Sequence, residues 1–327
     1  MLQPRRYRDR ISRGRLAFVL LFAAAVSSLS AQDSLSFRST SDNVPLFVTV
    51  IGKGGRIVTG LTREDFQLRD QGKPRPIVVF DDAPQPVRLI VLIDVSGSMI
   101  GNLPLLRAAC QELIAHLDPR DLARIGTFGK DIAISPVFTR DPQALLAALP
   151  DDISPNAPTP LWRAIDQALG GFGDSDGRRV VLVLSDGKDT GPGVLSRTIV
   201  DAVTVSDKAE REDVMIYGVA LSSRPPVNSI APRPRDLGEL MRENMPDPGL
   251  ARLAENTGGG YTEIRPRQDL AAEFGRIVDE LHQQYLLGFV PVGQDGKTHK
   301  VDVKVRGDVE VRARRSYRAP DGNRSPN

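Results

Sequence analysis

The chain has 327 residues, of which 40% are hydrophobic and 26% charged, a composition that is ordinary for a folded protein and argues against intrinsic disorder. Its net charge of +2 is small for this length, which argues against nucleic acid as a partner. Cys110 is the single cysteine, so no intrachain disulfide can form. We expect this thiol to be a small buried hydrophobic group on a helix.

The first segment of the chain is typical of an export signal. Several arginines precede an apolar stretch over residues 16–26, and the small residues Ser28, Ser30 and Ala31 follow it. The apolar stretch is about half of the roughly 20 residues that a membrane helix needs. We therefore predict a signal peptide over residues 1–31 and an exported protein that is periplasmic, secreted or associated with the cell envelope. We expect no stable membrane span after cleavage, and an uncleaved anchor is the alternative.

Residues 32–85 are expected to form a small antiparallel β module. The strand-like runs are 46–51, 56–58, 66–69 and 77–80. A glycine-rich break separates the first two runs, and a polar turn separates the last two. Pro74 and Pro76 indicate the edge of a sheet, because proline cannot donate to a strand ladder.

From residue 87 the pattern changes to alternating strands and helices. Residues 87–93 and 180–184 are near-continuous runs of Val, Leu and Ile, typical of strands that are buried on both faces of a parallel sheet. The other expected strands are 122–128, 131–137, 214–220 and 260–264, and the expected helices are 103–117, 142–149, 160–169, 196–211, 248–256 and 268–284. This order predicts a doubly wound, Rossmann-like, mostly parallel sheet over residues 86–284.

The stretch 222–247 interrupts this alternation. It is rich in Pro and Arg and much longer than the usual connections of about 4–6 residues, so it is a lid, a partner-binding loop or disordered chain. Residues 285–318 return to strand-like alternation, with runs at 285–290, 299–305 and 309–314, and residues 319–327 form a tail. Because a piece of two or three strands is only marginally stable alone, we expect residues 285–318 to pair with the module of residues 32–85.

Oxygen-bearing side chains gather where the expected strands end. Asp94, Ser96 and Ser98 follow the first buried run, Thr159 precedes a helix, and Asp186 follows the second buried run. Ligands of such sheets collect at the carboxyl ends of the strands, and hydroxyl and carboxylate oxygens suit hard cations such as Mg²⁺. Each residue alone is equally explained as a turn former or a helix cap. Their joint occurrence favours a divalent-metal site.

At these positions the chain resembles the metal-ion-dependent adhesion site (MIDAS) of von Willebrand factor type A (VWFA) domains. The family pattern is Asp-x-Ser-x-Ser, then a Thr on a second loop, then an Asp after a later strand. The resemblance implies that Ser96 and Ser98 bind the ion directly, Thr159 directly or through water, and Asp94 and Asp186 mainly through waters. It implies Mg²⁺, with Mn²⁺ or Ca²⁺ as alternatives, and a protein partner that offers Glu or Asp.

The flanks of the domain carry a second, less specific resemblance. Residues 284–289 and 311–317 look like those of secreted VWFA-related proteins of acidobacteria. The long stretch 222–247 departs from the well-studied adhesion domains, so their ligand surfaces do not transfer to this chain. Together the resemblances imply an exported, metal-dependent, adhesion-type binding protein rather than an enzyme.

Other readings of the chain remain open. A hydrolase with Ser96 as nucleophile needs a nearby base, but His116, His282 and His299 lie at a helix end or in the closing segments. No cluster of His and Cys is spaced for catalytic zinc. The main alternative is a metal-independent structural or scaffold protein of the cell envelope. A magnesium-dependent subunit of an intracellular ATPase complex would share the motif, although the leader argues for export. Oligomeric state and partner identity stay undetermined.

Overall fold

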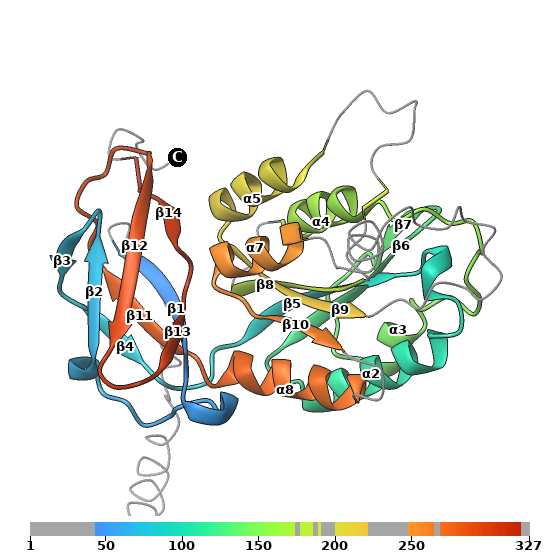
Figure 1. Ribbon diagram of the computed structural model, residues 1–327, viewed down its shortest axis with the longest axis horizontal. Helices are drawn as coiled ribbons and strands as arrows, with labels where there is room; N and C mark the ends of the chain where they lie inside the picture. The colour runs from blue at the N-terminus through green and yellow to red at the C-terminus, as the bar shows by residue number, and fades with distance from the viewer. Residues whose placement is uncertain are drawn as a thin grey trace, which may run out of the picture. The chain divides into compact units, whose positions relative to one another are not determined.

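The computed structural model describes residues 43–173, 177–185, 189–190, 200–221, 248–264 and 269–321 (Figure 1). Within these ranges, a six-stranded mixed sheet and its helices form an α/β domain, and two four-stranded antiparallel sheets form a β module. Both belong to one compact unit of the chain. The predicted fold class, a mostly parallel α/β sheet flanked by an antiparallel β module, is therefore confirmed.

The central sheet is parallel except at one edge. Its described strands lie in the order β10-β9-β8-β5-β6-β7, and β7 runs antiparallel to its neighbour β6. The bounds are β5 (Val87–Asp94), β6 (Leu122–Phe128), β7 (Ile132–Ile134), β8 (Arg178–Ser185), β9 (Val214–Leu221) and β10 (Tyr261–Ile264). Along β5, Leu89 and Val91 pack into one core while Ile90 and Leu92 pack into another. Both faces of the sheet are covered, which explains why its strands are continuous apolar runs.

Helices form a layer on each face of the central sheet. The first core contains side chains of α2 (Leu103–His116), α3 (Pro142–Leu146) and α8 (Leu270–His282). The second core contains side chains of α4 (Leu161–Leu169), α5 (Ala202–Arg211) and α7 (Pro248–Thr257). Short 3-10 turns lie at Lys53–Gly55, Arg63–Asp65, Gly97–Met99 and Gly170–Phe172. The arrangement is the expected doubly wound one.

An expectation about one residue of these helices is confirmed. Cys110 is buried on the inner face of α2, and its burial raises the pKa of the thiol to about 12. It therefore behaves as a small hydrophobic group. The Asp141 side chain accepts a hydrogen bond from Gln143 N and begins α3.

The β module combines strands from before and after the α/β domain. One of its sheets has the order β13-β1-β11-β4, and the other has the order β14-β12-β2-β3. The bounds are β1 (Val44–Ile51), β2 (Phe66–Asp70), β3 (Lys73–Arg75), β4 (Val79–Asp81), β11 (Tyr285–Phe289), β12 (Thr298–Val305), β13 (Glu310–Arg312) and β14 (Ser316–Arg318). Side chains of both sheets meet in one core. The α/β domain is thus an insertion within the β module, because neither flank supplies a complete sheet.

The strand boundaries of the β module differ from the sequence expectation in three places. The expected strand at 56–58 is reduced to an isolated bridge between Ile51 and Ile57. The segment expected as a turn after β2 contains β3, which includes Pro74 and lies at a sheet edge. The expected strand at 309–314 stops at Arg312, and β14 follows in the other sheet. Each difference depends on which strand is available for pairing, and local alternation does not encode that.

Several expectations concern residues outside the described ranges. These are the signal peptide 1–31, the stretch 222–247, the first residues of the helix expected at 196–211, and the last residues of the tail. Among the described residues, no helix combines the length and the apolar character that crossing a membrane requires.

Both connections between the β module and the α/β domain meet at Asp121. This carboxylate is fully buried, and its Oδ1 accepts a hydrogen bond from Val87 N at 2.8 Å. Its Oδ2 accepts one from Asp118 N at 2.8 Å and lies 2.7 Å from His282 Nε2. Val87 begins β5 and His282 ends α8. One side chain therefore fixes both the point where the chain enters the domain and the point where it leaves.

The C-terminal strands approach the α/β domain at a run of glycines that begins with Gly258. A Cβ atom at this position would lie 2.4 Å from Arg314 N, and its φ of 82° is in the left-handed region. Beside it, Arg315 N donates a hydrogen bond to Asn256 O at 3.0 Å. Glycine is required here because the two backbones pass too close for a side chain.

Candidate metal site

The site begins where β5 and β8 end side by side. The parallel register pairs Ile93 with Leu184, so Asp94 and Ser185 come next on adjacent strands. The Ser185 hydroxyl donates to Asp94 Oδ2 at 2.6 Å, and both residues are fully buried. Asp186 follows Ser185 directly in the sequence but lies outside the described residues. Its predicted place in the site therefore remains a prediction.

The first loop brings two hydroxyls together in front of Asp94. Ser96 N donates to Asp94 Oδ1 at 2.8 Å, which turns the chain back over the end of β5. A 3-10 turn over Gly97–Met99 follows and places Ser98 Oγ 3.0 Å from Ser96 Oγ. Ser96 is buried, whereas Ser98 is exposed. The loop thus offers adjacent oxygens on the open side and a buried carboxylate behind them.

The second loop is pressed against the first one. Gly97 N donates to Ala157 O at 3.1 Å, and a Cβ atom at Gly97 would lie only 2.1 Å from Pro155 O. Glycine at the centre of Asp-x-Ser-Gly-Ser is therefore a packing requirement of this chain. The contact fixes the two loops against each other, with Thr159 two residues beyond Ala157.

Thr159 is fixed through its backbone. Its N–H donates to Thr190 Oγ1 at 3.0 Å, and Thr190 N donates to Thr159 O at 3.0 Å. Leu161 N also donates to Thr159 O, at 2.9 Å, at the start of α4. Within the part of the chain that the structure describes, the buried Thr159 hydroxyl makes no hydrogen bond. It is available as a ligand, although no measured contact links it to Ser96 or Ser98.

The oxygens of the first loop fit a small hard cation. An octahedral Mg²⁺ with ligands at about 2.0–2.1 Å places neighbouring ligands about 2.9 Å apart. The Ser96 and Ser98 hydroxyls, which share a hydrogen bond, lie 3.0 Å apart. Hydroxyl and carboxylate oxygens are also ligands that hard divalent cations prefer. Ser96, Ser98 and Thr159 could hold the ion, with Asp94 supplying negative charge.

Two contacts of the site were missed by sequence reasoning. Ser185 holds Asp94, and Thr190 holds Thr159. Ser185 had a usable signal, because a residue just before Asp186 on a parallel neighbour of β5 must lie beside Asp94. Thr190 had none, since its pairing with Thr159 depends on how two loops fold over the sheet.

A small hollow borders the two loops. Its volume is about 480 Å³. Its walls are Gly129, Lys130, Asp131, Ile132, Pro158, Pro160, Arg163, Gln167 and Thr190. Pro158 and Pro160 flank Thr159 in the sequence, and Gly129 packs so close to Val95 that an added Cβ would lie 2.9 Å from Val95 O. The hollow is therefore lined directly by the second loop and adjoins the first loop only through Gly129.

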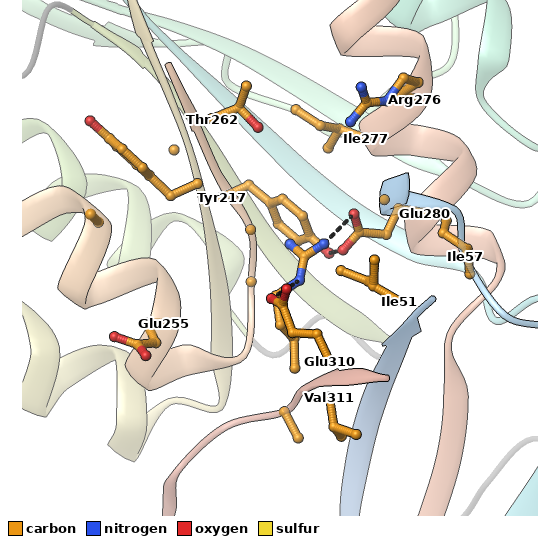
Figure 2. A pocket seen from close by; sticks show the side chains of 18 of the residues that line it. Ile51, Ile57, Tyr217, Glu255, Thr262, Arg276, Ile277, Glu280, Glu310 and Val311 are labelled. Atoms are coloured by element: carbon orange, nitrogen blue, oxygen red, sulfur yellow. Dashed lines mark hydrogen bonds and ion pairs between the residues drawn. The ribbon is translucent and has the colours of Figure 1, made fainter. Parts of the chain in front are cut away.

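A larger hollow, of about 1070 Å³, lies between the α/β domain and the β module (Figure 2). At its centre Glu280 Oε1 accepts hydrogen bonds from Tyr217 at 2.9 Å and from Thr49 at 3.2 Å, and Glu280 Oε2 lies 3.2 Å from Arg312 Nη2. Burial, then the nearby Glu280 charge, raises the pKa of Tyr217 well above its usual value, so this phenol stays protonated and donates.

Two further arginines of this larger hollow are also paired within the protein. Arg276 lies 3.1 Å from Glu273, and Arg315 forms an ion pair with Glu255. The central Glu280 is satisfied by donors from both the α/β domain and the β module. These contacts form a polar interface between the α/β domain and the β module. Their hydrogen-bonding groups are used within the protein.

Comparisons with known proteins place the α/β domain in a family. Residues 89–244 match the family model of the von Willebrand factor type A domain. No curated protein matches the chain significantly.

Similar solved structures include a von Willebrand factor type A protein from Catenulispora acidiphila, with 12% identity, a TM-score of 0.48, and coverage of 88% of this chain and 76% of that one. An aerotolerance-related membrane protein from Bacteroides fragilis NCTC 9343 has 18% identity, a TM-score of 0.44, and coverage of 60% and 98%. Proximal thread matrix protein 1 from the mussel byssus, with a zinc-occupied MIDAS motif, has 13% identity, a TM-score of 0.45, and coverage of 64% and 48%.

All three TM-scores lie below 0.5, so the family assignment rests on the sequence match. That match begins within β5 and includes Asp94, Ser96, Ser98, Thr159 and Asp186. The chain therefore carries a von Willebrand factor type A domain, to which residues 89–244 belong.

Proposed function

We propose that this protein is an exported, divalent-metal-dependent binding module that captures a partner protein through an acidic side chain. The observation that carries the proposal is the pair of hydroxyls on Ser96 and Ser98, 3.0 Å apart in front of the buried Asp94 carboxylate. Their spacing is that of neighbouring ligands around Mg²⁺. Among the described residues, no group of three or more His, Cys, Asp or Glu side chains offers another metal site.

The proposed ligands follow from this geometry. Ser96, Ser98 and Thr159 would hold Mg²⁺, and Asp94 and Asp186 would act on it mainly through waters. Mn²⁺ or Ca²⁺ are alternatives with the same oxygen preference. When bound, the ion supplies a Lewis-acidic position that a carboxylate oxygen of the partner can fill.

The chain's own residues explain why an anion would be favoured there. Hydroxyls contribute no charge to the cation, so most of its positive charge remains uncompensated at the open face. Asp94 lies behind them, engaged by Ser96 N and by the Ser185 hydroxyl. Ser98 is exposed, so a partner side chain can approach from that side. A Glu or Asp of another protein would complete the coordination.

A binding role agrees better with the histidine contacts than a hydrolytic role does. Activation of Ser96 would need a base within hydrogen-bond reach. His282 pairs with Asp121, His299 contacts Asp295 and Tyr317, and His116 contacts the Glu112 backbone. Each ring is thus engaged away from Ser96, and we propose that the protein is not an enzyme.

Export is the remaining part of the proposal and rests on the leader sequence. The arginine-rich start, the apolar stretch 16–26 and the small residues after it are typical of a cleaved signal. The protein would then act in the periplasm, outside the cell or at the cell envelope. Amino-terminal sequencing of the exported protein would check it, with Gln32 as the expected first residue.

Thermal unfolding with and without metal tests the site. A ligand that binds only the folded state stabilises it by about 2.7 kcal/mol at a hundred times its dissociation constant. Adding Mg²⁺ or Mn²⁺ to the metal-free protein should raise the Tm, by roughly 2–4 °C for each kcal/mol in a chain of this size. The emission of Trp162, the only tryptophan, should respond as well because it lies in α4 just beyond Thr159.

Substitutions make this experiment specific. Asp94→Ala and Asp186→Ala should each abolish the rise in Tm. Asp302→Ala is the matched control, because it removes an exposed aspartate from β12 in the β module. An unchanged unfolding curve of the wild type at saturating metal would contradict the proposal. Partner binding that survives EDTA would instead favour the metal-independent scaffold role.

A further inference from the structure

We propose that the hollow beside the metal loops is a second carboxylate subsite, so that the preferred partner is a peptide segment with two nearby acidic side chains. One acid would reach the metal, and the other would enter the hollow and pair with Lys130 and Arg163. This inference rests on the proposed function and names the partner of the same site. It concerns the residues that would decide which acidic segment is preferred.

The position of the hollow is the first argument. Pro158 and Pro160, which flank Thr159, form part of its wall, and Thr190 forms another part. Thr190 is the residue that holds Thr159 by two hydrogen bonds. Gly129 connects the hollow to the first loop through its close approach to Val95 O. The hollow therefore adjoins the residues on either side of Thr159, within the neighbourhood that a ligand on the metal would enter.

The charges in the wall are the second argument. Lys130 and Arg163 are exposed, and within the described part of the chain neither makes an ion pair or a side-chain hydrogen bond. Asp131 is the acidic group in the same wall, so the wall keeps one excess positive charge. A carboxylate complements that excess, whereas a cationic side chain would meet repulsion from both bases.

The larger hollow gives an internal contrast. There Arg276, Arg312 and Arg315 each lie beside a glutamate of the protein itself, and Figure 2 shows Glu280 among the side chains that line this hollow. Arg56 and Arg252 also line the larger hollow and make no ion pair among the described residues, but five acidic side chains match the five arginines of this wall. The wall therefore has no excess positive charge to attract an added carboxylate. Lys130 and Arg163 have no such internal partner among the described residues, which favours an external one.

The size of the small hollow limits the kind of partner. A volume of about 480 Å³ accommodates a side chain with some of its backbone, not a folded domain. In an extended segment, residues two apart lie on the same side and about 7 Å from each other. We therefore expect a flexible or extended acidic segment of a partner protein, in which the spacing between its acids determines the fit.

Labelled peptides test this inference by fluorescence anisotropy at saturating Mg²⁺. The probes are glycine-serine peptides with a single Glu, or with two Glu separated by one, two or three residues. At the best spacing, the wild type should bind the two-acid peptide about two- to fivefold tighter than the single-acid peptide, as expected for an exposed ion pair. Raising the salt concentration should reduce this preference.

Charge reversal provides the specific control. Lys130→Glu combined with Arg163→Glu should remove the preference for a second Glu and create a preference for Lys at that position. Lys304→Glu, on an exposed position of β12 in the β module, makes a charge change of the same kind and should leave the preference intact. Both reversed residues are exposed, so the fold and the Tm response to Mg²⁺ should persist.

The two proposals fail in different ways. Equal binding of single-acid and two-acid peptides, or a preference that survives the double reversal, overturns the subsite. If the single-acid peptide still binds in a Mg²⁺-dependent manner, the proposed metal site is supported and only the second carboxylate subsite is wrong. If neither peptide binds and Mg²⁺ does not change the Tm, both proposals are wrong.

Discussion

Asp94 and Asp121 are buried carboxylates at opposite ends of the same sheet, and their surroundings differ. Both side chains are fully buried. Asp121 precedes β6 and is held by Val87 N, Asp118 N and His282. Asp94 ends β5, and a backbone N–H and the Ser185 hydroxyl donate to it, with the Ser96 and Ser98 hydroxyls just beyond.

The comparison shows that burial of a carboxylate does not by itself tell whether the residue stabilises the fold or belongs to a binding site. At Asp121 a basic side chain and two backbone N–H groups surround the carboxylate. Two of these donors belong to Val87 and His282, which lie at the ends of β5 and α8. At Asp94 the neighbouring loop presents oxygens toward an exposed position. A buried charge surrounded by donors stabilises the fold, whereas one behind a set of open acceptors is suited to hold a cation.

Asp121→Ala should have the largest effect on stability. It leaves two backbone N–H groups and His282 without their acceptor, which we expect to lower the free energy of unfolding by about 3–5 kcal/mol. Denaturant titration of the variant measures this loss. The Mg²⁺-induced rise in Tm should persist in whatever fraction stays folded. Wild-type stability in Asp121→Ala would show that the junction is not held by this carboxylate.

Gly97→Ala should affect both stability and metal binding. The added Cβ would lie 2.1 Å from Pro155 O, so the two loops must separate. We expect a loss of about 1–3 kcal/mol, as for other overpacked positions, with a smaller Mg²⁺-induced rise in Tm. Gly293→Ala is the control, because nothing lies within 4 Å of its added Cβ. A full metal response in Gly97→Ala would mean that the contact between the loops does not position the ligands.

Ser98→Ala should separate binding from folding most clearly. Ser98 is exposed, so the free energy of unfolding without metal should change by less than about 0.5 kcal/mol. Loss of a direct ligand should weaken Mg²⁺ binding by at least about tenfold, or roughly 1.4 kcal/mol. Calorimetric titration with Mg²⁺ measures the affinity, and Ser206→Ala on α5 serves as the control. Unchanged affinity in Ser98→Ala would remove this residue from the proposed ligands.

Cys110 is a third buried ionisable group, and it lies in an apolar core. We expect its effect on stability to be the smallest of those considered. Burial raises its pKa to about 12, so the native thiol should resist alkylation that proceeds readily in denaturant. As the pH rises above the unfolded value of 9.0, the unfolded chain loses this proton while the folded chain keeps it. Stability from this group is therefore present below pH 9 and falls as the pH rises toward 12.

The difference between the wild type and Cys110→Ala over this pH range measures that contribution. Rapid alkylation of the native protein near pH 8 would contradict the burial of the thiol.

Much of the fold could be predicted because its signals are local. Continuous apolar runs at β5 and β8 follow from burial on both faces, and the helical spacing of apolar residues in α2 and α8 follows from their burial on one face. The pairing of the two β flanks could be predicted because each flank alone has too few strands to form a stable sheet. The short strands β3 and β14 were not predicted, since their existence depends on a neighbour with free backbone groups.

The candidate site was predictable in its residue types but not in its contacts. Asp94, Ser96 and Ser98 are close in sequence, so a turn brings them together. The bond between Ser185 and Asp94 joins residues that are 91 positions apart, and the contact between His282 and Asp121 spans 161 positions. His282 was considered only as a base for catalysis, because nothing near it in the sequence indicates a buried partner.

The sequence by itself determined the periodicity of the elements and the placement of oxygen-bearing residues after buried strands. The tertiary structure decided which buried acids are closed by basic partners and which face an open loop. It also left Lys130 and Arg163 without an ion pair among the described residues, whereas Arg276, Arg312 and Arg315 of the larger hollow each pair with a glutamate. The physical reason is that periodicity depends on neighbours along the chain, whereas charge compensation depends on groups that only folding brings together.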